Sequence, residues 1–341
     1  MNFAVFTNWR EEQLRAIPSA LDCGETNLCK ALSSLQPKAG ARSTSREIHR
    51  CDLARAWLAH YGMQTFDHRA ALVCRGVRHA LSLIFSTIAA QESILWLPGD
   101  VYPVYLELAA SAGIKCKSFR TLPKPVLPES QRMSRPEYLL LTNPLKPLGR
   151  FLSDDEVAVL RSWLSESRER RVILDCVYDL NAPLHSTTLE LWKTGQAVIL
   201  HSVAKGWLWP KTFGLALFPT ISPELSSAFR DDPPDPVQLQ LAERLISKES
   251  HLPAEIVSRL AHRKDALFRQ LPSTVVSSLV LKNHEFSPGC YFFASEMPFE
   301  YLLKRYSVVG IPASVFGSDW DGTILTSLSG NSASGDHRRE Q

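Results

Sequence analysis

Between about residues 70 and 220, short apolar runs alternate with amphipathic stretches of helical length. This alternation is typical of strand–helix–strand units, which build a mostly parallel sheet with helices on both faces. The apolar runs predict seven strands, at 70–74, 93–97, 114–119, 137–142, 171–176, 196–201 and 213–218. The stretches between them predict helices at 77–90, 103–112 and 153–167, the last opened by Ser153 and Glu156 as a capping box. We therefore expect an α/β protein built on one seven-stranded sheet.

The pattern changes after residue 220. A proline-rich acidic linker, DDPPDP at 231–236, precedes two helical stretches near 237–249 and 253–270, and β-like segments return at 274–282 and 289–295. We interpret this part as a smaller α+β domain that the N-terminal segment completes. The expected division is a large domain at 45–235, a small domain made of 1–44 and 236–330, a loop at 36–46, and a disordered tail at 331–341.

Composition excludes several classes of function. The 38 basic and 35 acidic residues leave a net charge of +3, which gives no basic excess for binding nucleic acid or an anionic membrane. No signal peptide or membrane-spanning apolar stretch is recognisable. The seven cysteines are scattered and odd in number, which favours reduced thiols and a cytoplasmic location. Because neither cysteines nor histidines follow a ligand spacing, we expect no metal site.

Residues that can carry chemistry stand where two of the predicted strands end. Asp175 ends the run RVILD with Tyr178 three residues later, and Lys205 follows the run AVIL in the segment HSVAK. Each has an ordinary alternative: an aspartate can cap a turn, a tyrosine can pack on a sheet, and most lysines are solvated. The carboxyl ends of parallel strands meet at one edge of a sheet, however, so the three are expected to lie together.

The order Asp-x-x-Tyr and then Ser-x-x-Lys resembles the fold-type-I enzymes that use pyridoxal 5′-phosphate (PLP). The similarity spans roughly residues 20 to 330 and indicates a divergent member of the class I/II, or aspartate, aminotransferase family. It implies that Lys205 forms an imine with PLP and moves the substrate proton. It also implies that Asp175 keeps the pyridine nitrogen protonated and that Tyr178 binds the phenolic oxygen. Ser202 matches a serine that binds the phosphate.

The same resemblance implies further cofactor contacts. The segment CRGVRHA resembles a phosphate-binding turn at a helix start, formed by Gly76, Val77 and Arg78, and Lys211 loosely matches a phosphate-binding arginine. Tyr102 matches an aromatic residue that stacks on the pyridine, with simple packing as the alternative. The segment TNPLKPLGR matches a loop whose first asparagine is Asn143, but Lys146 replaces the second, which contacts the phenolic oxygen. The Lys146 cation could bind the cofactor by holding that oxygen ionised, or the loop could turn away from the cofactor.

The substrate side departs from the family pattern. Gly24 matches the N-terminal segment that covers the substrate, whereas the arginine that usually binds the α-carboxylate falls on Leu325. The first hypothesis is an aminotransferase for an amino acid or an amine-type small molecule. The second is a PLP-dependent cyclase or lyase, performing elimination or decarboxylation in a specialised biosynthetic pathway, and the third is a non-catalytic PLP-fold binding protein. The resemblance alone also implies a homodimer.

Overall fold

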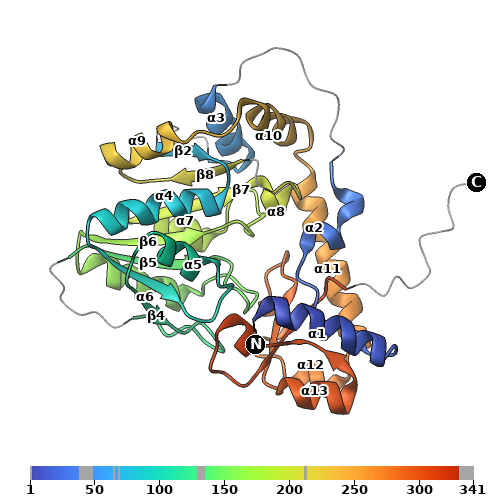
Figure 1. Ribbon diagram of the computed structural model, residues 1–341. Coiled ribbons are helices and arrows are strands. Elements are labelled where there is room, and N and C mark those ends of the chain that lie inside the picture. Colours follow the sequence, from blue (N-terminus) through green and yellow to red (C-terminus); the bar gives the residue numbers. More distant parts are fainter. Residues whose placement is uncertain are drawn as a thin grey trace, which may run out of the picture.

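The computed structural model describes residues 2–37, 49–63, 66–67, 70–128, 135–210 and 213–329. Its larger part is a seven-stranded sheet in the order β2-β8-β7-β6-β5-β3-β4 (Figure 1). The strands are β2 (Ala71–Cys74), β3 (Ile94–Pro98), β4 (Cys116–Phe119), β5 (Glu137–Thr142), β6 (Arg170–Asp175), β7 (Ala197–Ser202) and β8 (Gly214–Leu217). All seven predicted strands are therefore confirmed, with ends that shift by one or two residues.

The direction of the strands determines which ends lie side by side. Strands β4, β3, β5, β6 and β7 are mutually parallel, and β8 is antiparallel to both β7 and β2. Strand β2 consequently runs with the parallel group. The register places Thr142 beside Asp175 and Ser202 beside Gly214. The turns after β2, β3, β5, β6 and β7 therefore open at one edge, where ligands of open α/β sheets bind.

Both faces of the sheet are covered by helices. Along β6, Val172 and Leu174 belong to one hydrophobic cluster, and Ile173 between them belongs to the other. Because successive residues of a strand point to opposite faces, continuous apolar runs are what a doubly covered sheet requires. One face carries α4 (Val77–Ala90), α5 (Val104–Ser111) and α9 (Pro223–Asp231), and the other carries α3 (Arg50–His60), α6 (Asp154–Ser165) and α7 (Ser186–Trp192) (Figure 1). Helix α6 begins with the predicted capping box of Ser153 and Glu156.

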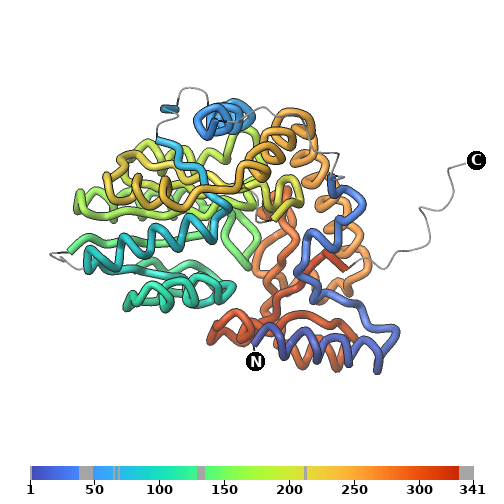
Figure 2. The backbone as a smooth tube through the Cα atoms, turned by 45° about the horizontal axis from the view of Figure 1, so that its top comes forward, coloured from blue at the N-terminus to red at the C-terminus, as the bar shows by residue number. Residues whose placement is uncertain are grey.

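A second, smaller part brings the two ends of the described chain together. Figure 2 shows α1 (Phe3–Ala16) lying along the C-terminal elements. Strand β1 (Leu21–Asp22) pairs in parallel with β10 (Val308–Val309), and β11 (Ile311–Pro312), β12 (Thr323–Thr326) and β9 (Phe292–Ser295) form an antiparallel sheet. The division of the chain at residues 45 and 235 stays a prediction.

Helices and short turns surround these strands. They are α2 (Leu28–Ala31), η1 (Ser33–Leu35), α8 (Val203–Gly206), α10 (Pro236–Lys248), α11 (Leu252–Gln270), α12 (Ser273–Ser277), η3 (Asn283–Glu285), α13 (Phe299–Tyr306) and η4 (Ala313–Phe316). The predicted helices near 237–249 and 253–270 correspond to α10 and α11. None of the helices in the described ranges combines the length and the apolar character needed to cross a bilayer. Most of the predicted loop at 36–46, and the whole predicted tail at 331–341, lie outside the described residues.

The β-like interpretation of 274–282 is wrong. Residues Ser273–Ser277 form α12, and only an isolated bridge from Leu279 to Ser295 joins this segment to a strand. Pro272 precedes the helix, and Val275 is fully buried on its inner side. The β-branched residues that suggested a strand therefore pack from a helical turn, because tertiary packing outweighs a weak intrinsic preference. Of the segment 289–295, only Phe292–Ser295 is a strand.

Candidate active site

A cavity of about 730 Å³ opens at the edge where the parallel strands end. Turns after β2, β3, β5, β6 and β7 form its floor, and Phe3, Thr26, Phe292 and Phe316 approach from the smaller part. Most of the candidates from the sequence line it together, namely Gly76, Val77, Arg78, Tyr102, Lys146, Asp175, Tyr178, Ser202 and Lys205.

Lys205 reaches this cavity from the short helix α8, directly after β7. Ser202 begins that helix in extended conformation, and its hydroxyl accepts a 3.3 Å hydrogen bond from the Ala204 amide. The Lys205 side chain is half-buried, with its Nζ 5.1 Å from the centre of the Tyr178 ring. Burial lowers the pKa of Lys205, but the hydrogen bond and charge of Tyr178 outweigh burial and raise that pKa above its usual range. The Lys205 amine is therefore held beside a phenol oxygen with which it can exchange a proton.

Asp175 is a buried carboxylate, 6% exposed, at the last residue of β6. Its Oδ2 accepts a 2.7 Å hydrogen bond from the Tyr105 hydroxyl, and its Oδ1 accepts one of 3.1 Å from the Val177 amide. Burial raises the pKa of Asp175 even though these donors and the nearby lysines lower it. Its anion is therefore incompletely compensated, and the site favours a further cation facing the cavity.

Tyr178 links the floor of the cavity to the smaller part of the chain. Its hydroxyl oxygen accepts a 2.8 Å hydrogen bond from Tyr291, and the Nζ of Lys146 lies over the face of its ring. Burial, followed by the charge of Lys205, holds the pKa of Lys146 well below its usual range. Two lysine amines of different basicity therefore lie close to one phenol.

The turn between β2 and α4 has the features of an anion site. Gly76 occupies the N-cap of α4 with a φ of 131°, and no side chain caps the first amides of the helix. A Cβ on Gly214, in the adjoining strand, would come within 2.5 Å of the Gly76 backbone, so glycine is required there. Free amides and the helix dipole together attract negative charge, phosphate above all.

The charged side chains of that turn differ in whether they contact a carboxylate. Arg75 donates two hydrogen bonds of 2.5 and 2.7 Å to Asp232, and His79 lies 2.9 Å from the same carboxylate. Exposed Arg78 lies 5.9 Å from the centre of the Tyr102 ring, which is itself 48% exposed. Arg78 can thus turn toward an anion at the helix start, whereas Arg75 is held by its ion pair.

No protein-family model matches the chain, and no curated protein matches its sequence. Solved structures do match. An aminotransferase from Mycobacterium tuberculosis superposes with a TM-score of 0.68 at 17% identity, covering 96% of this chain and 91% of that one. YbdL of Escherichia coli, described with a methionine aminotransferase function, gives 0.66 at 19% identity, covering 97% and 93%. A protein of Corynebacterium diphtheriae described as a PLP-dependent β-cystathionase gives 0.64 at 13% identity, covering 92% and 89%.

The chain has the type I fold of PLP-dependent aminotransferases. The mostly parallel seven-stranded sheet with helices on both faces agrees with the architecture expected from the sequence. The likeness extends over nearly the whole chain, although its sequence identity is low.

Three candidates do not line the cavity of this type I fold as described. Asn143 is fully buried, donates to the hydroxyls of Thr187 and Thr188, and accepts from the Leu152 amide. Gly24 is not among the residues that line the cavity, and a Cβ there would meet the Arg10 side chain at 2.8 Å. Lys211 lies outside the described residues.

Two tyrosines that contact the central residues are not among the candidates named from the sequence. Tyr105 binds Asp175, and Tyr291 binds Tyr178 from just before β9. Tyr105 follows Tyr102 by three residues in the sequence, which is a usable signal. Tyr291 offers none, because only the folded chain brings the segment PGCYFF to the sheet edge.

Proposed function

We propose that the chain is a PLP-dependent aminotransferase that acts on an amino acid or a related amine, with Lys205 as the residue that carries the cofactor. The observation that carries this proposal is the meeting of Asp175, Tyr178 and Lys205 at one cavity on the carboxyl edge of a type I fold. An incompletely compensated carboxylate, a phenol and a half-buried amine that meet in one cavity are typical of a functional site.

The residues present fit PLP. When bound, PLP supplies an electron-withdrawing ring that stabilises negative charge at the α-carbon of the substrate. Asp175 offers the anion that a protonated pyridine nitrogen needs, and burial raises the pKa of this carboxyl. The open amides at the start of α4, together with Ser202 and Arg78, offer donors for the phosphate.

The side chains around Lys205 suggest how the proton moves. Tyr178 hydrogen-bonds the Lys205 Nζ, while the hydrogen bond from Tyr291 fixes the Tyr178 hydroxyl. Tyr102 presents an exposed ring at the β3–α5 turn, where it can cover a flat heterocycle. In this proposal Lys205 therefore removes and returns the substrate proton, and Tyr178 sets its basicity.

The assignment of Lys205 is tested by covalent labelling. Purified protein is mixed with PLP, reduced with sodium borohydride and digested, and the phosphopyridoxyl peptide is identified by mass spectrometry. We expect the label on Lys205, none after Lys205→Ala, and full labelling of Lys205 after substitution of the exposed Lys193 by alanine. Absence of label from the wild type, or labelling of another lysine in it, would overturn the proposal.

A lyase or cyclase is the second candidate, favoured by one observation. Leu325 is fully buried in β12 and cannot bind a carboxylate as the usual arginine does. How the substrate is held decides which bond at the α-carbon is broken. Incubation of the PLP-loaded protein with single amino acids separates the two. Accumulation of pyridoxamine phosphate supports an aminotransferase, whereas product release with the cofactor unchanged supports a lyase or cyclase.

The homodimer and the cytoplasmic location are also proposals. The seven cysteines are free, and Cys23, Cys74, Cys176 and Cys290 are buried, which suits a reducing compartment. Light scattering on the protein as it elutes from a size-exclusion column would test the dimer. We expect a molar mass of about twice the 38.2 kDa of one chain.

A further inference from the structure

Lys146 stands in the cavity without an acceptor for its amine. Its backbone amide donates a 2.9 Å hydrogen bond to Thr142, which fixes the loop after β5. Beyond Tyr178, its Nζ approaches the ring centres of Tyr291 and Phe292 at 5.1 and 5.0 Å. Within the described ranges, no carboxylate, hydroxyl or carbonyl oxygen makes a hydrogen bond to this Nζ. Three aromatic rings enclose this amine, which faces the cavity and can bind an anion there.

The other cations that line the described cavity have different surroundings. Arg75 and His79 are paired with Asp232, and Lys205 interacts with Tyr178. Arg78 lies in the first turn of α4, after β2, and β8, β7 and β6 separate β2 from the strand that precedes Lys146. Four strand spacings correspond to roughly 19 Å. An anion at Lys146 would therefore be separate from a phosphate at Arg78.

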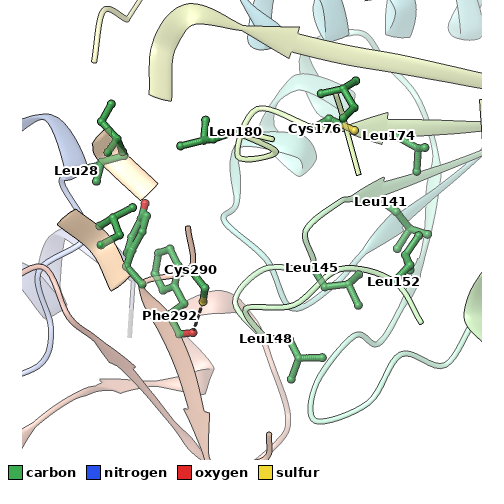
Figure 3. Close-up of a cluster of buried hydrophobic side chains, with 14 of the residues drawn as sticks. Leu28, Leu141, Leu145, Leu148, Leu152, Leu174, Cys176, Leu180, Cys290 and Phe292 are labelled. Atoms are coloured by element: carbon green, nitrogen blue, oxygen red, sulfur yellow. Dashed lines mark hydrogen bonds between the residues drawn. The ribbon is translucent and has the colours of Figure 1, made fainter. Parts of the chain in front are cut away.

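Lys146 lies near the strands that usually provide the carboxylate arginine. Leu325 occupies that position and pairs across the small sheet with Phe293, the neighbour of Phe292. Figure 3 shows the loop of Leu145 and Leu148 beside Cys290 and Phe292, so the segment that carries Lys146 packs directly on β9. Lys146 therefore lies close to β9, which is the strand of the small sheet that pairs with β12.

We propose that Lys146 binds the carboxylate of the substrate in place of the missing arginine, and that the side chain of the substrate is apolar. This inference rests on the proposed function and specifies its substrate class as amino acids with a hydrophobic side chain. The apolar part would lie against Phe3 and Phe316, whose rings meet edge-on at 5.0 Å, and against Phe292. A carboxylate beside Lys146 favours the protonated amine that burial disfavours, so binding should raise the pKa of Lys146.

The test compares an acid with a neutral molecule of the same shape. The PLP-loaded wild type, Lys146→Met and Lys146→Arg are titrated by calorimetry with 3-phenylpropionate and with 3-phenylpropan-1-ol. A charge-assisted hydrogen bond predicts that the wild type binds the acid about tenfold or more tightly than the alcohol. Lys146→Met should lose this preference while its affinity for the alcohol changes by less than about twofold. Lys146→Arg should keep the preference. Titration in two buffers of different ionisation enthalpy should show proton uptake only when residue 146 is lysine.

Two results would overturn the inference. One is an undiminished preference for the acid in Lys146→Met, and the other is an equal loss of affinity for acid and alcohol in that variant. If the preference is undiminished and the visible spectrum of PLP bound to Lys146→Met is altered, Lys146 is assigned to the phenolic oxygen instead. Borohydride labelling of Lys205 is performed first. If that labelling fails, the aminotransferase proposal fails, and the unloaded protein still shows whether a preference for the acid depends on Lys146.

Discussion

The proposed chemistry depends on the carboxylate of Asp175, which asparagine changes by a single atom. Asparagine in its place keeps the size but cannot hold a cation opposite the cavity, so we expect Asp175→Asn to slow transamination by about 10² or more. Tyr105→Phe removes only the 2.7 Å hydrogen bond and should have a smaller effect of about tenfold. The measurement is the single-turnover rate of the PLP-loaded enzyme with an amino acid that the wild type converts.

A matched control exists for this prediction. Asp179 is equally buried in the turn after β6 but binds the backbone of His185 and Asn181 rather than lining the cavity. Asp179→Asn should therefore lower stability and leave the single-turnover rate within about threefold of wild type. Similar rates for Asp175→Asn and the wild type would contradict the role given to Asp175.

The sequence indicates a residue of this site only where the residue belongs to a local pattern. Asp175, Tyr178 and Lys205 each follow an apolar run that ends at the same sheet edge. Tyr291 meets Tyr178 across 113 residues, and no pattern signals such a contact. Asn143 belongs to the expected loop pattern, yet its side chain turns to Thr187 and Thr188, because these two hydroxyls lie beside it in the folded core.

The loop between β5 and α6 depends on Gly149, where geometry predicts a large cost of substitution. Gly149 has a φ of 90°, and a Cβ there would lie 2.4 Å from both the Cys290 Sγ and the Phe292 carbonyl oxygen. Gly149→Ala should therefore lower the free energy of unfolding by about 3 kcal/mol or more. Gly195→Ala shares the positive φ but meets nothing within 4 Å, so about 1 kcal/mol is expected. Urea unfolding compares the two variants, and equal losses would refute the steric argument.

Elements are predictable where burial on both faces makes a strand uniformly apolar. Every residue of β7 is buried, and its run AVILHS is visible in the sequence. Strands β1, β10 and β11 have two residues each and leave no such run, because only pairing with distant partners defines them. The valines of α12 suggest a strand from the sequence, because the burial of Val275 in a helical turn is evident only in the folded chain.

At the scale of the whole molecule, a buried histidine couples folding to pH. His201 lies in β7, 1% exposed, with its Nε2 2.9 Å from the Asp179 carbonyl oxygen and its ring against Trp57 and Tyr61. Burial, with a smaller contribution from His60, lowers the pKa of His201 from 6.5 to about 4. In the unfolded chain His201 regains its ordinary pKa and binds a proton that the folded state refuses.

The sign of the effect follows from that difference. Between pH 6.5 and about 4 the unfolded state binds more protons at His201, so the stability due to this residue is present above pH 6.5 and is lost as the pH falls. Asp179 acts oppositely, because burial raises its pKa to about 6 and the folded state then holds the proton more tightly. His201→Gln retains a donor for the Asp179 carbonyl but does not titrate, and it leaves the contribution of Asp179 in place. Relative to wild type, we expect this variant to gain up to about 3 kcal/mol in free energy of unfolding between pH 7 and pH 4. Urea titrations of both proteins at several pH values in this range measure the difference, and parallel curves would show that His201 already titrates normally in the folded chain.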